Sequence, residues 1–144
     1  MPMDDANTPA TGHASPVPHV LVAEDHPVNR VVAQAMLASL GVSCTLAEDG
    51  EEAVQCAATV EVDLILMDLH MPGLDGLEAT RQLRAQAAAA GRARVPVVAM
   101  TGGDEAQDGP ACLAAGMDGF LAKPFTVEAL KDCLRRHGVP CTAG

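Results

Sequence analysis

Aromatic residues are almost missing from this chain of 144 residues, which has no Trp or Tyr and only Phe120 and Phe125. A core with so few rings must be filled by Ala, Val, Leu, Ile and Met, which suits helices packed tightly on a sheet. At this length the chain can bury one core but not two. We therefore expect one small domain.

Basic runs, long apolar stretches and paired cysteines are also missing from the sequence. A formal net charge of -10 without a Lys/Arg cluster argues against nucleic acid or an anionic membrane as a direct partner. No stretch has the length of a membrane span or the pattern of a secretion signal. The five cysteines are scattered and form no CxxC pair, which argues against a zinc or disulfide framework and fits a reducing compartment. Together these absences favour a cytoplasmic protein.

The remaining sequence divides into a linker-like start and one domain. Residues 1–17 are rich in Pro, Thr, Ala and Asp without apolar periodicity, as in a disordered tail or linker. Residues 18–138 form the expected domain, and residues 139–144 a short C-terminal tail. Five short apolar runs in the domain are typical of strands buried on both faces of a parallel sheet: HVLVAED, CTLAED, VDLILMD, VPVVAMT and MDGFLAK.

Helical patterns separate these runs. Apolar residues three and four apart predict that one face of the first helix is buried: Val28, Val31, Val32, Ala35, Met36 and Leu40. Asp75, followed by Glu78, and Thr126 are expected to cap later helices. Five βα units predict a doubly wound (βα)5 α/β sandwich with a parallel sheet and helices on both faces.

Polar residues follow four of the expected strands. Glu24 and Asp25 follow the first, Asp68 the third, Thr101 the fourth and Lys123 the fifth. With the strand order 2-1-3-4-5, ligands bind beyond the carboxyl ends of the strands, where the order reverses, so these side chains should converge there. Helix N-capping is the alternative explanation for the acids, but it leaves the lysine unexplained.

Three neighbouring carboxylates would repel one another by roughly 1 to 4 kcal/mol per pair and therefore need a cation. Oxygen ligands in an incomplete protein cage suit Mg²⁺, which keeps waters and shares itself with phosphate oxygens. Lys123 would supply a positive charge for the oxygens of a phosphoryl group. The pattern therefore indicates magnesium-dependent phosphoryl chemistry.

Four segments, VLVAEDHPVNR, DLILMDLHMPGLDG, PVVAMTG and AAGMDGFLAKPF, resemble in order and spacing the receiver domains of response regulators and, most closely, of hybrid histidine kinases. The resemblance covers about residues 18–138. It implies a flavodoxin-like fold, Mg²⁺ as the cofactor, and transfer of a phosphoryl group from a histidine kinase or histidine phosphotransfer domain. It also implies a signal passed on by the face formed by the fourth helix, fifth strand and fifth helix.

The resemblance also implies a role for each residue that matches the family pattern. Asp68 corresponds to the phosphoacceptor, and Glu24, Asp25, Asp68 and the backbone carbonyl of His70 correspond to the metal ligands. Thr101 and Phe120 correspond to the switch residues, and Lys123 to the phosphate-pairing lysine, joined to Pro124 by a cis bond. A receiver catalyses its own phosphorylation and dephosphorylation and is otherwise not an enzyme.

Several alternatives remain at this point. A phosphatase of the haloacid dehalogenase class also uses an Asp nucleophile with Mg²⁺, but it needs a second Asp where His70 stands. A nucleotide site would need a glycine-rich loop in place of EDHPVN. His26 and His70 could contribute to a transition-metal site. The chain could be a stand-alone receiver or a piece of a hybrid kinase, and the sequence leaves the oligomeric state open.

The fourth helix is expected to depart from the family pattern. Gly109 and Pro110 fall inside it, and Pro costs about 3 kcal/mol in a helix interior while Gly adds roughly 1 more. We predict a short helix over residues 109–115, capped by Asp108 and preceded by a loop over residues 102–107. The alternative is a full-length helix that Pro110 only kinks.

Overall fold

The computed structural model describes residues 17–102 and 105–141 of the chain. The strands are β2 (His19–Ala23), β3 (Ser43–Ala47), β4 (Leu64–Asp68), β5 (Val97–Thr101) and β6 (Gly119–Ala122). The helices are α1 (Pro27–Ser39), α2 (Gly50–Thr59), α3 (Gly76–Ala89), α4 (Glu105–Ala115) and α5 (Val127–Arg136). All strand pairs are parallel, in the order β3-β2-β4-β5-β6. This is the predicted order 2-1-3-4-5.

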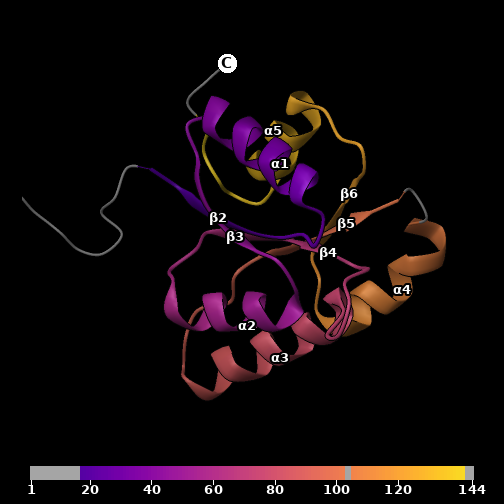
Figure 1. Ribbon diagram of the computed structural model, residues 1–144. Helices are drawn as coiled ribbons and strands as arrows, with labels where there is room; N and C mark the ends of the chain where they lie inside the picture. The colour runs from indigo at the N-terminus through magenta and orange to yellow at the C-terminus, as the bar shows by residue number, and fades with distance from the viewer. Residues whose placement is uncertain (1–16, 103–104, 142–144) are drawn as a thin grey trace, which may run out of the picture.

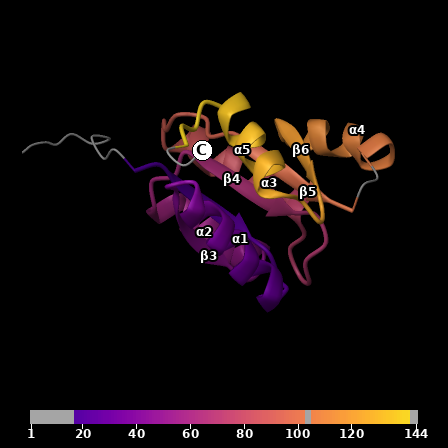
Figure 2. The ribbon, with the colours of Figure 1, turned by 90° about the horizontal axis from the view of Figure 1, so that it is seen from above.

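The sheet lies between two layers of helices (Figure 1). Helices α1 and α5 cover one face, and α2, α3 and α4 lie on the other (Figure 1), while the view from above shows α4 at the end of the sheet formed by β5 and β6 (Figure 2). Alternate residues of each strand point to opposite faces. In β4, Leu64 and Leu66 therefore pack in the core under α1 and α5, and Ile65 and Met67 pack in the core under α2, α3 and α4. Every residue of β4 is buried, which explains its continuous apolar sequence. In the described part of the chain no helix combines the length and apolar character needed to cross a bilayer.

The buried face of α1 differs from the predicted one. Val28, Val31 and Val32 are 63%, 64% and 43% exposed, whereas Ala33 and Leu37 are buried against the sheet. Apolar residues surround most of this helix, so their spacing allowed more than one face to be chosen. The expected burial of the three valines was therefore wrong, although Leu40 of the predicted face is buried and Met36 packs against the core.

Helix α4 also differs from the prediction, because it begins at Glu105 and contains Pro110 in its interior. The expected short helix over 109–115 was wrong, and so was the expected loop as far as it concerned residues 105–107; residues 103 and 104 lie outside the described part. The helix continues past the proline because Gly109 and Cys112 are buried on the sheet side while Pro110 is exposed. Packing thus outweighs the cost of one lost backbone hydrogen bond.

Helix caps account for some of the polar residues at strand ends. The side chains of Asp49, Asp75 and Thr126 accept hydrogen bonds from the N–H groups of residues three further on, at 2.8, 2.9 and 3.1 Å. The predicted caps at Asp75 and Thr126 are confirmed. The N-cap residue of α1 is His26, whose side chain makes no capping bond. Capping therefore explains Asp49 and Asp75 but not Asp25 or Asp68.

Two glycines allow the loop after β4 to pack closely. A Cβ atom at Gly50 would lie 2.1 Å from the carbonyl oxygen of Leu74, and one at Gly76 would lie 2.2 Å from that of Asp68. Real Cβ atoms cannot come so near to backbone atoms without a shift of the chain. These glycines thus let α2 and α3 begin directly against the segment that follows Asp68.

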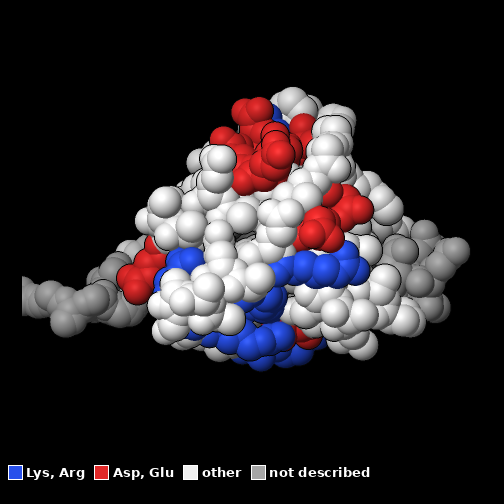
Figure 3. All heavy atoms as spheres, turned by 90° about the horizontal axis from the view of Figure 1, so that it is seen from below, with Lys and Arg blue, Asp and Glu red and all other residues white. Residues whose placement is uncertain are grey.

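Arginine side chains tie helices together at the amino edge of the sheet. Arg92 donates to the carbonyls of Ala57 and Ala58 near the end of α2. A positive charge at this end of a helix interacts favourably with the helix dipole. Arg84 of α3 donates to the carbonyl of Gly116, just after α4, and pairs with Asp118. In Figure 3 the basic side chains lie in one part of the α2–α3 face, and acidic side chains gather at another edge. At the amino edge of the sheet, backbone carbonyls that end α2 and follow α4 thus accept hydrogen bonds from charged arginine side chains.

Residues at the C-terminal boundary continue the packed structure beyond α5. Val139 is 1% exposed and donates its N–H to the carbonyl of Leu134. The expected tail therefore contributes Val139 to the core, and Cys141 packs against it. The expected linker over residues 1–17 lies outside the described residues except for Val17, which is exposed.

Candidate functional site

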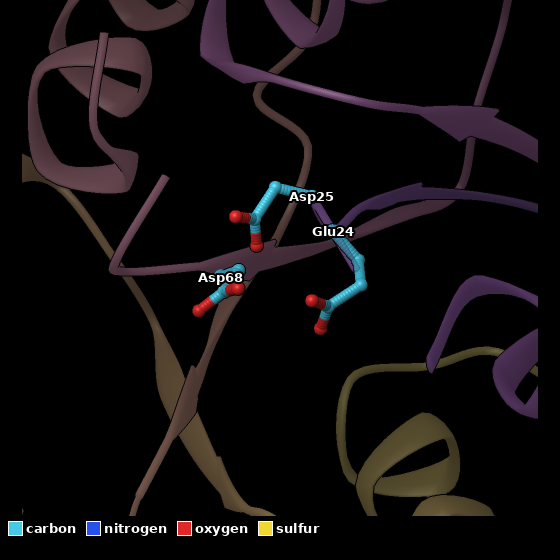
Figure 4. A group of neighbouring side chains, drawn as sticks. All are labelled: Glu24, Asp25 and Asp68. Atoms are coloured by element: carbon cyan, nitrogen blue, oxygen red, sulfur yellow. The ribbon is translucent and has the colours of Figure 1, made fainter. Parts of the chain in front are cut away.

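Three carboxylates converge at the carboxyl edge of the sheet, between β2 and β4. Each of Glu24, Asp25 and Asp68 offers an oxygen, and these oxygens lie within 4.8 Å of one another. Glu24 and Asp25 directly follow β2, while Asp68 ends β4, the strand beside it. Figure 4 shows the carboxyl group of Asp25 directed toward Asp68. The parallel pairing of the two strands thus brings together acids that are 43 or 44 residues apart in sequence.

Lys123 completes the cluster from the end of β6, the edge strand that lies two strands away from β4. Its Nζ atom lies 3.0 Å from Oε1 of Glu24 and 3.4 Å from Oδ2 of Asp68. The N–H of Lys123 also donates to the carbonyl of Thr101, at 2.6 Å, which fixes the start of the loop after β6. The peptide bond that follows, to Pro124, is cis.

Burial and charge act in opposite directions on these groups. Burial raises the pKa of Asp68 above its ordinary value, and the nearby carboxylate of Glu24 raises it further. Burial also opposes ionisation of Glu24, but the Lys123 ammonium and the N–H of His26 outweigh it and lower the pKa of Glu24. The pKa of Lys123 is raised despite burial, since Glu24 and Asp68 both stabilise its charge. The cluster therefore combines one ammonium with three carboxyl groups, and within it burial and charge shift the pKa values of Glu24 and Asp68 in opposite directions.

The donor set suits a hard divalent cation. Glu24 and Asp68 are 2% and 4% exposed, whereas Asp25 is exposed to solvent. Two buried carboxylates next to an open third make an incomplete oxygen cage, in which a cation could retain waters and bind further oxygens. An ion there would also offset the repulsion that raises the pKa of Asp68. The residues present therefore fit Mg²⁺.

The two predicted switch residues, Thr101 and Phe120, lie on the neighbouring strands β5 and β6. Thr101 ends β5, next to Asp68 in the sheet order, and is 1% exposed. Phe120 is half-buried and packs into the core beneath α4. A Cβ atom at Gly109 would lie 3.7 Å from Cζ of the Phe120 ring, so α4 has its smallest residue where it meets this ring. The sheet thus places Thr101 at its carboxyl edge, while Phe120 lies further back, opposite Ala99 in the middle of β5.

The two histidines of the site loops contribute backbone groups. His26 donates its N–H to Oε2 of Glu24, at 3.1 Å, and His70 donates its N–H to Oδ1 of Asp68, at 3.2 Å. Across the described ranges, the group of side chains close enough to share a metal ion consists of acids alone. The geometry offers no support for a histidine-containing transition-metal site.

Sequence reasoning missed two residues of α1. The side chain of Asn29 hydrogen-bonds to Glu24 and helps to lower its pKa. Arg30 donates from NH1 to the backbone carbonyl of Glu24, at 2.9 Å. Their positions in the first turns of a helix that starts at the acidic loop could have indicated these contacts, because such side chains can reach back to the residues before the helix.

Comparisons with known proteins agree with this geometry. The profile of the response regulator receiver domain family matches residues 20–135. The sensor histidine kinase RcsC of Salmonella typhi is 37% identical over 115 residues, which are 80% of this chain and 12% of that protein. Histidine kinase 5 of Arabidopsis thaliana is 34% identical over 143 residues, covering 83% of this chain and 16% of that protein. The chain thus spans less than a fifth of the length of these relatives.

Solved structures show the same fold with substantial identity. The receiver domain of sensor histidine kinase PA1611 from Pseudomonas aeruginosa, whose crystal structure has magnesium in the active site cleft, has a TM-score of 0.75 and 45% identity, covering 83% of this chain and 96% of that one. The receiver domain of Ssk1 from Saccharomyces cerevisiae, crystallised with the histidine phosphotransfer protein Ypd1, has a TM-score of 0.80 and 32% identity, covering 85% of this chain and 90% of that one. The matched region is a receiver and not a kinase catalytic core. From its family match, its fold and its acidic cluster, the chain belongs to the response regulator receiver domains of phosphorelay signalling.

Proposed function

We propose that Asp68 is the phosphoacceptor of this receiver domain. The observation that supports it most is the convergence of Asp68 with two further carboxylates and the ammonium of Lys123, on a strand buried along its whole length. A nucleophile needs an adjacent group that stabilises the negative charge of the incoming phosphoryl group, and Lys123 lies 3.4 Å away. Among the carboxylates of the described chain, Glu24 and Asp68 both combine burial, a lysine partner and two acidic neighbours, and the family pattern assigns the phosphoacceptor role to Asp68.

The reaction we propose is a direct transfer. A carboxylate oxygen of Asp68 attacks the phosphorus of a phosphohistidine, the P–N bond breaks, and the imidazole leaves as the acyl phosphate forms. Lys123 shifts its ammonium from the two carboxylates toward the phosphoryl oxygens. Glu24, Asp25, Asp68 and the backbone carbonyl of His70 would hold Mg²⁺, which supplies charge neutralisation at the same oxygens.

Incubation of the protein with acetyl phosphate tests this function. With Mg²⁺ we expect one alkali-labile phosphoryl group per chain, located at Asp68 by mass spectrometry, and no labelling when the metal is chelated. A phosphatase of the haloacid dehalogenase class would instead turn over a phosphomonoester continuously. Steady turnover without stoichiometric labelling would favour that second function.

We propose that the partner that supplies the phosphoryl group docks on α1. The exposed residues Val28, Val31 and Val32 form an apolar patch on the helix that starts two residues after Asp25. A cavity of about 310 Å³ adjoins the patch, with Val32, Met36 and Phe125 in its wall and Glu24 and Lys123 at its site end. A partner docked on this surface would lie next to the acidic cluster. A helix of a histidine kinase or histidine phosphotransfer domain with apolar side chains fits it, and the related Ssk1 receiver binds such a protein.

Replacement of Val31 by Glu tests the docking surface. We expect about a tenfold loss in the efficiency of transfer from a phosphorylated histidine phosphotransfer domain, because a charge would face an apolar partner. Labelling by acetyl phosphate should stay the same, because this small donor needs no docking. Leu113→Glu on α4 is the matched control, since Leu113 is 62% exposed and lies on the other face of the sheet. Equal loss in both variants would contradict a specific role for α1.

We propose that the domain also hydrolyses its own phosphoaspartate rapidly. Gly102 follows Thr101, is exposed, and has open space where a side chain would stand. Water can therefore approach the phosphoryl group from this side. Gly103, the second glycine after Thr101, lies outside the described residues.

The lifetime of the phosphorylated protein tests this openness. Gly102→Thr is expected to lengthen the half-life several-fold, because the new side chain would restrict the approach of water to the phosphoryl group. The measurement is loss of radiolabelled phosphate at neutral pH. Ala114→Thr, at an exposed position on α4, provides the control. Equal half-lives of all three proteins would show that Gly102 does not control hydrolysis.

The output we propose is a shift of the α4–β6–α5 face. The hydroxyl of Thr101 would move toward the acyl phosphate, and the ring of Phe120 would fill the space that it leaves. Such a switch selects between conformations already present in the unphosphorylated protein. The packing of Phe120 beneath Gly109 supports this route, since it joins the ring directly to α4.

A further inference from the structure

Arg30 forms a contact within the site that the proposed reaction does not explain. This α1 residue donates from NH1 to the backbone carbonyl of Glu24, at 2.9 Å, and its side chain is only 16% exposed. Its other nitrogen lies 4.0 Å from a carboxylate oxygen of Glu48, a side chain that is 72% exposed. An ion pair that long and that exposed contributes little to stability. The bond to the carbonyl is therefore the stronger of the two contacts.

The carbonyl of Glu24 belongs to the same planar peptide unit as the N–H of Asp25. A donor that holds this oxygen fixes the orientation of the whole unit and so the direction in which the chain reaches the Cα atom of Asp25. The neighbouring bonds fix Glu24 from both sides, since its N–H donates to Ala47 and its side chain accepts from His26.

Asp25 depends on its backbone for its position. Its side chain is exposed, and none of the described residues forms a hydrogen bond or an ion pair with it. Glu24 and Asp68, in contrast, are both held by Lys123 and by backbone N–H groups. Among the three acids, Asp25 is thus the one whose carboxyl group has no support from another side chain.

From these contacts we infer that Arg30 is a positioning residue, which orients Asp25 toward the metal position by holding the Glu24–Asp25 peptide unit. The inference rests on the proposed function, in that Asp25 is taken to be a metal ligand. Arg30 acts here through the backbone: its charge is not among the causes of the pKa shifts of Glu24 or Asp68.

Replacement of Arg30 by Met removes the donor and keeps the apolar stem. We expect Mg²⁺ to bind about tenfold more weakly by calorimetric titration, as for other supporting contacts behind metal ligands. Arg30→Lys, which retains a cationic donor, should restore part of the affinity. Glu48→Gln removes the ion pair alone and should change the affinity by less than about twofold. Arg81→Met, which removes an exposed arginine of α3, is the matched control.

A double-mutant cycle separates positioning from general destabilisation. If Arg30 acts through Asp25, the Arg30→Met change should have almost no further effect on Mg²⁺ affinity in a protein that already contains Asp25→Ala. A purely structural role would weaken binding by the same factor in both backgrounds and would overturn the inference. An unchanged affinity in Arg30→Met alone would overturn it as well.

A measurement without the metal gives an independent readout. In metal-free Arg30→Met we expect the amide signals of Asp25 and His26 to shift and broaden in nitrogen-15 NMR spectra, while those of β5 stay unchanged. Unchanged signals at Asp25 would contradict the positioning role. If Asp25→Ala itself leaves Mg²⁺ binding unaltered, the proposed metal site fails. If Asp25→Ala weakens binding and Arg30→Met does not, only the role of Arg30 fails.

Discussion

Asp68→Asn is expected to abolish phosphorylation by acetyl phosphate, with a fall in labelling rate of about 10³-fold or more, because the amide is a far poorer nucleophile. The variant should also fail to respond to beryllofluoride. Phe120 and Phe125 are the only aromatic residues, so aromatic proton NMR signals can follow that response almost without overlap. Asp132→Asn, at an exposed position on α5, is the control. Full stoichiometric labelling of Asp68→Asn would place the phosphoacceptor elsewhere.

The Asp68→Asn variant should fold at least as stably as the wild type without metal. Burial, together with Glu24, raises the pKa of Asp68. A carboxyl group whose pKa is raised on folding costs stability once the pH exceeds its ordinary value, and the cost is complete above the raised pKa. The neutral amide removes this cost at neutral pH. Thermal unfolding of the metal-free proteins would therefore show that lost labelling is not a consequence of unfolding.

Lys123→Met is expected to reduce the rate of phosphorylation by about 10²-fold, because the ammonium that stabilises the phosphoryl oxygens is removed. Asp68 remains in place, so the phosphorylated protein should still form at long times. Lys131→Met on α5 is the control for loss of one positive charge. A rate equal to that of the wild type would show that Lys123 serves only as a counter-ion in the resting state.

Lys123→Met should also reverse how the carboxyl group of Glu24 makes the unfolding stability of the protein depend on pH. In the wild type the pKa of Glu24 is lowered, so its contribution is present above its ordinary value and is lost as pH falls through the lowered pKa. Without Lys123 the burial of Glu24 and Asp68 is less compensated, so the pKa of Glu24 should rise and the pKa of Asp68, which is already raised, should rise further. We expect the variant to be about 1 to 3 kcal/mol less stable at neutral pH. This difference should narrow as pH falls through the raised values, as urea unfolding at several pH values would show.

The sheet could be predicted because its signals are local and repeated. Each strand is a short, mostly apolar run followed by a polar residue, and the strand order 2-1-3-4-5 brings Asp25, Asp68 and Lys123 together. The capping residues Asp75 and Thr126 were also predicted, since a cap depends on a side chain and an N–H group three residues apart. Features that depend on two or three neighbouring residues were therefore recovered.

The errors concern helices whose packing the local sequence does not determine. In α1 the small residue Ala33 approaches the sheet while Val31 and Val32 face solvent, and apolar spacing alone does not distinguish these arrangements. In α4 Pro110 does remove a backbone hydrogen bond, as expected. The free energy gained by burying Gly109 and Cys112 outweighs this cost, and that gain depends on a sheet surface built from distant segments of the chain. Arg30 was missed because its partner is a backbone carbonyl, so only its place in the first turns of α1, and no pairing of side-chain types, could have indicated the contact.

The arginine contact at Gly116 has a geometric consequence for the motion of α4. Two guanidinium nitrogens of Arg84 hold the carbonyl just beyond the last turn of this helix, at 2.7 and 3.1 Å, while its first turn lies toward the Thr101 end of β5. A helix fixed at one end pivots about that end. Over 11 residues, with a rise of about 1.5 Å each, the distance from the pivot to the first turn is about 15 Å, so a shift of about 1 Å there equals a tilt of about 4°. Side chains near Gly116 would hardly move, and the displacement would grow steadily along the helix toward Glu105.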